Sequence, residues 1–206
     1  MTRDELAARL QSACARVIAA EQELTEIDSR FGDADHGLTM TKIAKAISSA
    51  AEGAEGGIQS LLDDAAMAVM TLNGGSAVPL WNTWLDGLQE EAPAGDEIDT
   101  AGLKAIFARA LEELDGMSGA AVGDKTMMDA LIPASQAIAA YGGSDPAELF
   151  TVAAKAAAEG AENSKNFVSK FGRAKSYGEK TLGTPDAGAM SMSYFFQGLA
   201  QTGTQL

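Results

Sequence analysis

The sequence contains few of the residues from which several common kinds of site are built. Its 206 residues include one cysteine, Cys14, and one histidine, His36. A single cysteine cannot form a disulfide within the chain, and together with a single histidine it cannot complete a four-ligand zinc site. These two scarcities exclude a disulfide scaffold and a structural zinc domain.

Long apolar runs and positive charge are scarce as well. No apolar stretch approaches the roughly 18 residues of a membrane span, and the first residues, MTRDELAARLQ, do not have the pattern of a signal peptide. Lys and Arg number 15 against 29 Asp and Glu, which gives a formal net charge of -14. Nucleic acid and anionic membranes would repel such a chain. We therefore expect a cytoplasmic protein without nucleic-acid or membrane partners, although a phosphate compound remains compatible if divalent cations lie between.

The residues that are present favour helices. Hydrophobic residues make up 46% of the chain, many of them alanine and few β-branched. Apolar residues recur at helical spacing, and they predict eight amphipathic helices over about residues 6–27, 38–47, 61–72, 80–88, 103–114, 127–138, 145–167 and 189–199. Pro133 should kink the sixth helix or end its first part. We expect an all-α fold, a single domain over residues 1–206 with about eight antiparallel helices.

Four of the predicted joints are too rich in glycine and polar residues to be simple turns. They span residues 28–39, 73–79, 115–126 and 172–188. They follow alternate helices, and alternate loops of an up-and-down array share one end. The sequence therefore predicts a composite site at one end of the bundle.

The first joint concentrates acid in the run Gly32-Asp-Ala-Asp-His-Gly37, with Asp28 just upstream. Three neighbouring carboxylates repel one another unless cations neutralise them, and such oxygen ligands select Mg²⁺ or Ca²⁺. The alternative is a solvated acidic turn in which an aspartate caps the second helix. His36 would contact a nucleotide in the first case and would be a capping or packing histidine in the second.

Two further joints are suited to phosphate. The loop Asn73–Pro79 offers glycines and free amides at a helix start, which favour phosphate, although a plain turn remains an alternative. In the fourth joint Arg173, Lys175 and Lys180 are a basic patch on an acidic chain, or else a solvated face. Arginine can stabilise a phosphoryl group during transfer. Taken together, the joints indicate a magnesium-dependent phosphate or nucleotide site.

With these motifs in view, the sequence resembles the nucleotide-binding L subunit of bacterial dihydroxyacetone kinase nearly end to end. The resemblance rests on Gly32–Gly37, Gly123-Asp-Lys-Thr-Met127, Gly172-Arg-Ala174 and the loop Gly183–Gly188. It implies a barrel of eight antiparallel helices that holds ADP or ATP at one end through two Mg²⁺ ions. It also implies a partner, a separate K subunit that holds the ketose covalently through a histidine.

The resemblance assigns roles to individual residues. Asp28, Asp33 and Asp35 would be the metal ligands, and Arg173 would be the catalytic residue near the phosphates. The nucleotide site would be lined by His36, Gly37, Leu38, Thr39, Ser76, Ala77, Ser118, Met127, Arg173, Asp186, Ala187 and Gly188. Ser118 is carried over by register only. The second loop departs from the usual Gly-Gly-Ala-Ser-Gly-Pro, because it reads Gly74-Gly-Ser-Ala-Val-Pro79 and places Val78 where the family has glycine.

The function that the resemblance implies is that of a ketose kinase subunit. Some relatives keep ADP as a coenzyme that a phosphotransferase-system protein rephosphorylates, while others exchange free ATP, and the ketose could be dihydroxyacetone or erythrulose. Two alternatives from other classes are the nucleotide domain of a fatty-acid-kinase-like system and a non-catalytic nucleotide-binding regulatory module.

Overall fold

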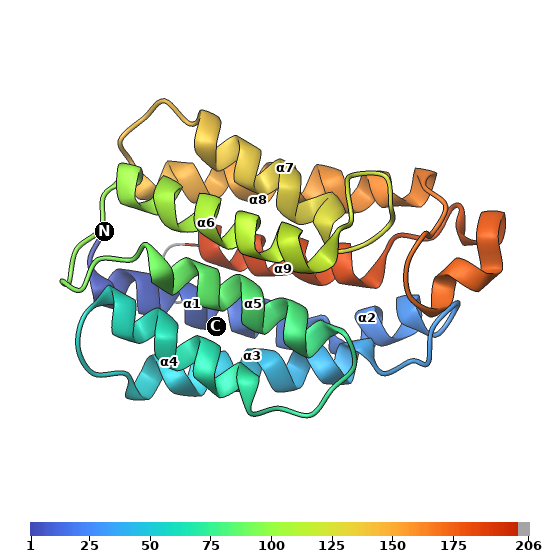
Figure 1. The fold of residues 1–206 in the computed structure, drawn as a ribbon, viewed down its shortest axis with the longest axis horizontal. Coiled ribbons are helices and arrows are strands. Elements are labelled where there is room, and N and C mark those ends of the chain that lie inside the picture. The colour runs from blue at the N-terminus through green and yellow to red at the C-terminus, as the bar shows by residue number, and fades with distance from the viewer. Residues whose placement is uncertain (202–206) are drawn as a thin grey trace.

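The computed structural model describes residues 1–201, and helices joined by loops make up this part of the chain (Figure 1). The α-helices are α1 Arg3–Ala19, α2 Glu21–Asp28, α3 His36–Gly53, α4 Ile58–Met70, α5 Ala77–Glu90, α6 Thr100–Ser118, α7 Met128–Ala140, α8 Pro146–Asn163 and α9 Ala187–Ala200. Two 3₁₀ segments, η1 Ser164–Asn166 and η2 Arg173–Thr181, follow α8. The all-α prediction is confirmed. None of the described helices is long and apolar enough to cross a membrane.

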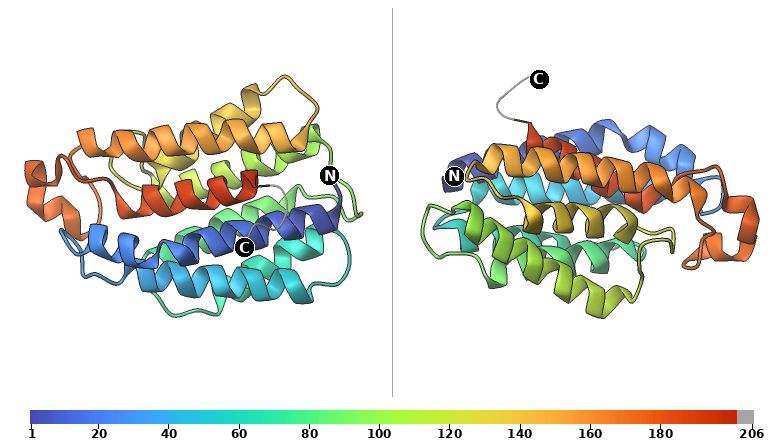
Figure 2. Two further views of the ribbon diagram at one scale, coloured as in Figure 1. Left: turned by 180° about the vertical axis from the view of Figure 1, so that it is seen from behind. Right: turned by 90° about the horizontal axis from the view of Figure 1, so that it is seen from above.

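Eight of the helices form a closed ring. Each packs against the next in the order α1, α3, α4, α5, α6, α7, α8 and α9, and α9 returns to pack against α1. The helix α2 stands outside this ring, against α3, and extends the structure at one end (Figures 1 and 2). The fold is therefore an antiparallel helical barrel with one short additional helix.

Half of the twelve aromatic residues of the chain are packed inside the barrel. They come from α5, α6, α8 and α9, and they are Trp81, Trp84, Phe107, Phe150, Phe195 and Phe196. The Trp84 ring centroid lies 5.5 Å from that of Trp81 and 5.5 Å from that of Phe195, both edge-to-face. This is the geometry that aromatic quadrupoles favour. Large rings thus fill the interior of a barrel whose helices are otherwise rich in alanine.

Several helix starts follow directly from capping residues in the sequence. Thr2 and Glu5 form a capping box at α1, and Asp99 and Asp145 accept backbone N–H bonds at α6 and α8. At α9 the cap is Asp186, whose carboxylate accepts from the Ala189 amide at 2.8 Å. These side chains satisfy amides that have no partner within their helix.

The single long helix expected over residues 6–27 is wrong. The chain breaks at Ala20, which has ψ near 5° and donates its N–H to Val17 three residues back at 3.1 Å. The broken pattern separates α1 from α2, and α2 then packs against α3. No glycine or proline marks the position, so the sequence gives no local signal for the break.

The structure also decides two details of the predicted helices and joints. Of the two outcomes expected at Pro133, a kink or a helix end, the end is excluded, because α7 continues through the proline to Ala140. The fourth joint is not an open loop, because its Arg173–Thr181 portion forms η2, with non-helical backbone at Gly178. Residues of this joint are thereby held in a short ordered segment.

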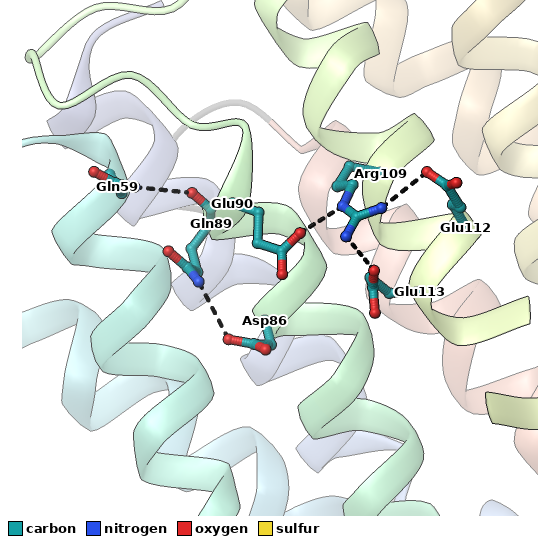
Figure 3. A network of polar contacts seen from close by, with 7 residues as sticks. All are labelled: Gln59, Asp86, Gln89, Glu90, Arg109, Glu112 and Glu113. Carbon is teal, nitrogen blue, oxygen red and sulfur yellow. Dashed lines mark hydrogen bonds and ion pairs between the residues drawn. The ribbon is translucent and has the colours of Figure 1, made fainter. Parts of the chain in front are cut away.

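A polar network ties two neighbouring helices of the ring together on the outer surface. Arg109 of α6 forms ion pairs with Glu90 of α5 and with Glu112 and Glu113 of its own helix (Figure 3). Arg109 is 30% exposed, so each pair contributes modestly to stability. Glu90 is the last residue of α5, and the network therefore lies away from the loop that precedes α5.

Gly160 is predicted to be essential to the contact between α7 and α8. A Cβ at this position would lie 2.0 Å from the carbonyl oxygen of Asp129, and that oxygen has no amide partner at Pro133 four residues later. We expect Gly160→Ala to lower the free energy of unfolding by about 1–3 kcal/mol, as overpacking does. Urea unfolding followed by circular dichroism measures it.

The matched control for this substitution is Gly116→Ala in α6, where an added Cβ meets nothing within 4 Å. This change should be neutral or stabilise by up to about 1 kcal/mol, because alanine has the higher helix propensity. Equal stability of the two variants would contradict the packing argument.

Candidate functional site

The four polar joints lie at one end of the barrel, as their alternation along the chain predicts (Figures 1 and 2). Lys125 Nζ donates to the Thr184 carbonyl at 2.6 Å, which joins the third and fourth joints. A Cβ at Gly74 would lie 3.2 Å from Thr39, so the second joint lies against the start of α3. These contacts bring segments distant in sequence into one surface, here called the rim.

At the rim the three predicted metal ligands converge. Asp28, Asp33 and Asp35 each offer a carboxylate oxygen, and these oxygens all lie within 4.8 Å of one another. Gly32 permits the close turn, since a Cβ there would lie 2.0 Å from an Asp28 carboxylate oxygen. Ala34, between the other two aspartates, has a left-handed φ of 61°. The loop therefore accepts backbone strain in the conformation that gathers the carboxylates.

Asp28 also caps the helix that follows the loop. Its Oδ2 accepts the backbone N–H of Asp35 at 3.2 Å, whereas Asp35, the N-cap residue of α3, makes no side-chain cap bond. The capping alternative thus holds for one of the three aspartates. It does not account for Asp33 and Asp35, both of which are exposed. The amino end of α3 adds a favourable partial positive charge beside the cluster.

The donor set fits a hard divalent cation. It consists of carboxylate oxygens alone, the ligands that Mg²⁺ and Ca²⁺ prefer. Among residues 1–201, one ion pair involves the cluster, and it joins Arg173 Nη2 to Asp33 Oδ2 at 2.8 Å. The Arg173 side chain is 70% exposed. The pair is therefore weak, and it leaves the other two carboxylates without a cationic partner.

The segment that carries Arg173 folds back onto the acidic loop. Tyr177 of η2 packs against Phe31, with ring centroids 5.3 Å apart. Arg30 Nη1 donates to the Thr184 hydroxyl at 3.3 Å. Together with the Arg173 ion pair, these contacts place the basic joint next to the metal-type cluster.

The single histidine faces the rim from the start of α3. His36 Nε2 lies 3.2 Å from the Ser191 hydroxyl, which itself donates to the Gly188 carbonyl at 2.9 Å. Burial lowers the pKa of His36, which favours the neutral ring. His36 thus links α3 to the glycine at the start of α9.

Several residues of the predicted nucleotide site are brought together. A Cβ at Gly188 would lie 3.3 Å from the Met127 nitrogen and 3.0 Å from an Asp186 carboxylate oxygen. Ala187, the first residue of α9, lies between Asp186 and Gly188. Gly37 is buried against α2, where a Cβ would lie 2.1 Å from the Glu21 carbonyl oxygen. The starts of α3, α7 and α9 are therefore packed as one unit.

Other predicted residues are less closely tied to this unit. Ser118 is the last residue of α6, and its hydroxyl accepts the Ala120 amide at 3.3 Å. Leu38 is half exposed and Ser76 is exposed, while Ala77 begins α5. In the altered second loop, Val78 is buried, and its Cγ2 would lie 2.5 Å from a Cβ at Gly74. The valine thus packs within its own loop.

Sequence reasoning missed two residues beneath the rim, Lys125 and Asp129. Asp129 is fully buried and accepts the amides of Gly123 and Thr126 at 2.6 and 2.7 Å. Lys125 is 4% exposed and donates to three backbone carbonyls. The motif Gly123–Met127 marks the segment, but its side-chain contacts depend on residues far along the chain.

The fold and the rim together define a helical barrel domain with a composite acidic site at its loop end. The chain belongs to the DAK2 domain family, whose model matches residues 30–201. The D-erythrulose kinase of Mycolicibacterium smegmatis is 36% identical in an alignment of 194 residues that covers 91% of this chain and 33% of that kinase. The chain thus spans about a third of the length of that relative.

Two further relatives agree with this assignment. The ADP-binding subunit DhaL of the PEP-dependent dihydroxyacetone kinase from Escherichia coli is 28% identical in an alignment of 192 residues that covers 91% of each chain. The structure of C. freundii dihydroxyacetone kinase in complex with AMP-PNP and Mg²⁺ superposes with a TM-score of 0.70 at 24% identity, over 95% of this chain and 33% of that one. The resemblance to the L subunit and the barrel fold are confirmed.

The carboxyl group of Asp186 should make stability depend on pH. Burial, the largest cause, raises its pKa from 3.8 to about 7. A carboxyl group with a raised native pKa stabilises the fold when protonated, and this stability is lost as pH rises through the native value. We expect Asp186→Asn, which keeps an oxygen for the Ala189 amide, to gain melting temperature relative to wild type as pH rises from about 4 to about 7.

The measurement is thermal unfolding of both proteins in metal-free buffer across that range. Asp99→Asn, at the exposed cap of α6, is the control, and its difference from wild type should stay constant. A constant difference for Asp186→Asn as well would show that the raised pKa does not contribute.

Proposed function

We propose that residues 1–206 act as the nucleotide-binding domain of a dihydroxyacetone-type ketose kinase. The observation that carries the proposal is the convergence of three carboxylates and an arginine at one rim of a DAK2 barrel. The reaction transfers a phosphoryl group to a ketose held by a K subunit. The donor is ATP, which either exchanges with free nucleotide or is regenerated in place when a phosphotransferase-system protein rephosphorylates ADP that stays bound as a coenzyme.

In this proposal the acidic loop holds the cations. Asp28, Asp33 and Asp35 bind two Mg²⁺ ions, and the amino end of α3 faces the same place. When bound, Mg²⁺ would neutralise the negative charge of the carboxylates and of the phosphate oxygens of the nucleotide. The nucleotide would lie against the packed starts of α3, α7 and α9, where His36, Met127 and Gly188 come together.

Arg173 acts on the phosphoryl group. It stands on η2 directly beside Asp33, so its guanidinium is already at the cluster, and its exposure leaves it free to turn toward a polyphosphate. A planar guanidinium can donate two parallel hydrogen bonds to phosphate oxygens. It would stabilise the charge on the phosphoryl group during transfer.

The ketose is held by a partner or by a further domain. The single histidine of the chain is occupied by Ser191 within the rim, so it is not placed to carry a sugar. The surface beside the site is suited to docking, because η2 and its flanks expose Phe171, Tyr177 and Leu182. The erythrulose kinase relative is about three times longer than the region it shares with this chain, which supports the same division of labour.

Binding of MgADP and MgATP tests the site. Calorimetric titration of nucleotide-free protein should show binding that EDTA abolishes. We expect Asp35→Asn to weaken MgADP by about 10- to 100-fold or more, since even outer partners of a metal site reach that range. Asp63→Asn, an exposed aspartate within α4, should leave binding unchanged.

Two outcomes bear on the proposal directly. Absence of binding by verified nucleotide-free wild type would contradict it, and equal affinity of Asp35→Asn and wild type would contradict the ligand assignment. ADP released from the denatured purified protein would support the retained-coenzyme form, and exchangeable ATP would support the ATP-dependent form.

Arg173 distinguishes a kinase from a module that only binds nucleotide. Arg173→Gln should reduce phosphoryl transfer to dihydroxyacetone or erythrulose by about 10³-fold or more, as loss of a transition-state arginine does. Its affinity for MgADP should stay within a few-fold of wild type, measured by the same titration. Lys175→Gln, an exposed cation of the same segment, is the control and should retain turnover. Retained turnover in Arg173→Gln would refute the catalytic role.

A further inference from the structure

Lys125 has an unusual combination of backbone and side-chain features for a lysine. Its φ is +61°, a left-handed value that side chains other than glycine seldom adopt. The residue is 4% exposed, although lysine is among the residue types that are rarely buried. Strained backbone and a buried charge persist only where surrounding contacts hold them.

The ammonium group of Lys125 is fully used by backbone oxygens. Its Nζ donates to the carbonyls of Ser164 at 2.8 Å, Phe167 at 3.1 Å and Thr184 at 2.6 Å. An ammonium group has three protons to donate, and none remains for a phosphate. Although Gly-Asp-Lys-Thr places a lysine in a glycine-containing loop, Lys125 is therefore not a phosphate-binding lysine.

The three carbonyls belong to two segments that meet at the rim. Ser164 and Phe167 follow the end of α8, and Thr184 precedes the cap of α9. The Ser164 hydroxyl also accepts the amide of Asp186 at 2.8 Å. The Thr184 hydroxyl accepts from Arg30, beside the acidic loop. The Lys125 ammonium group thus ties the residues after α8 to the residues just before α9. The latter lead directly into the Asp186–Gly188 segment.

Asp129 fixes the backbone around Lys125. This buried carboxylate accepts the amides on either side of the lysine, those of Gly123 and Thr126. Met127, at the start of α7, follows immediately. The charges of Asp186 and Asp129 act on the Lys125 ammonium and oppose the lowering of its pKa by burial. The contacts of Asp129 thus hold the turn in which Lys125 stands.

We propose that Lys125 is a positioning residue, which locks the Met127 loop and the Asp186–Gly188 segment into one rigid surface for the nucleotide. The proposal rests on the function proposed above. It adds that the affinity for nucleotide depends on a residue whose own protons are all directed away from the ligand. The lysine acts by fixing the starts of α7 and α9 relative to each other.

The test compares Lys125→Met with Lys170→Met. Lys170 lies in the same region and pairs with Asp124, but its side chain is 62% exposed and does not reach the three carbonyls. Both variants lose one positive charge. We expect Lys125→Met to weaken MgADP by at least about tenfold by calorimetry, a change of about 1.4 kcal/mol. Lys170→Met should stay within about twofold.

A local role is separated from general stability by two further measurements. Lys125→Gln keeps two N–H donors and should recover part of the affinity, and it serves as the second variant if Lys125→Met does not fold. Hydrogen exchange should accelerate at residues 121–126 and 182–188 in folded Lys125→Met. The amides of residues 61–65, in the half of α4 that lies away from the rim, should exchange as in wild type.

The outcomes distinguish the positioning role of Lys125 from the proposed nucleotide-binding function on which it rests. Wild type that does not bind MgADP would contradict the proposed function. Wild type that binds, with Lys125→Met or Lys125→Gln binding equally well, would overturn the positioning role alone. An equal loss in Lys170→Met would also overturn it, because the effect would then follow from net charge.

Discussion

The structure depends on how closely the last helix of the ring approaches the first. A Cβ at Gly198 of α9 would lie 2.3 Å from the Ala13 Cα of α1, so the two backbones pack together at a pair of small residues. Nearby, Arg9 donates to the Leu199 carbonyl at 2.6 Å and lies over the Phe150 ring. This contact closes eight antiparallel helices into a barrel. Closure then decides which loops share an end, and hence where a composite site can form.

The distribution of charge gives the rim its character. Lys and Arg number 15 in the chain, and Lys165, Lys170, Arg173, Lys175 and Lys180 fall within one short stretch. That stretch folds back beside the three carboxylates of the acidic loop. A surface with both signs of charge is suited to a polyphosphate with its cations, which also carries both. The net charge of -14 meanwhile repels other polyanions.

Much of this arrangement could be predicted from the sequence, because it depends on local patterns. Helical periodicity located the helices, Asp145 and Pro146 marked the start of α8, and the alternation of polar joints placed the rim at one end. The break at Ala20 could not be predicted, since alanine is the best helix former and nothing local interrupts the pattern. The same is true of Lys125, whose partners lie 39 to 59 residues away.

Backbone strain is confined to the loops of the candidate site. Within residues 1–201, Ala34 and Lys125 are the non-glycine residues with positive φ, both at 61°. Ala34 separates two predicted metal ligands, and Lys125 stands two residues before Met127. Each costs of order 1 kcal/mol or more and persists only if surrounding contacts over-determine it. Asp28 bonds the amide that follows Ala34, and Asp129 bonds the amides that flank Lys125. In both loops a carboxylate therefore holds the strained turn, and the barrel supplies the rigidity against which it is held.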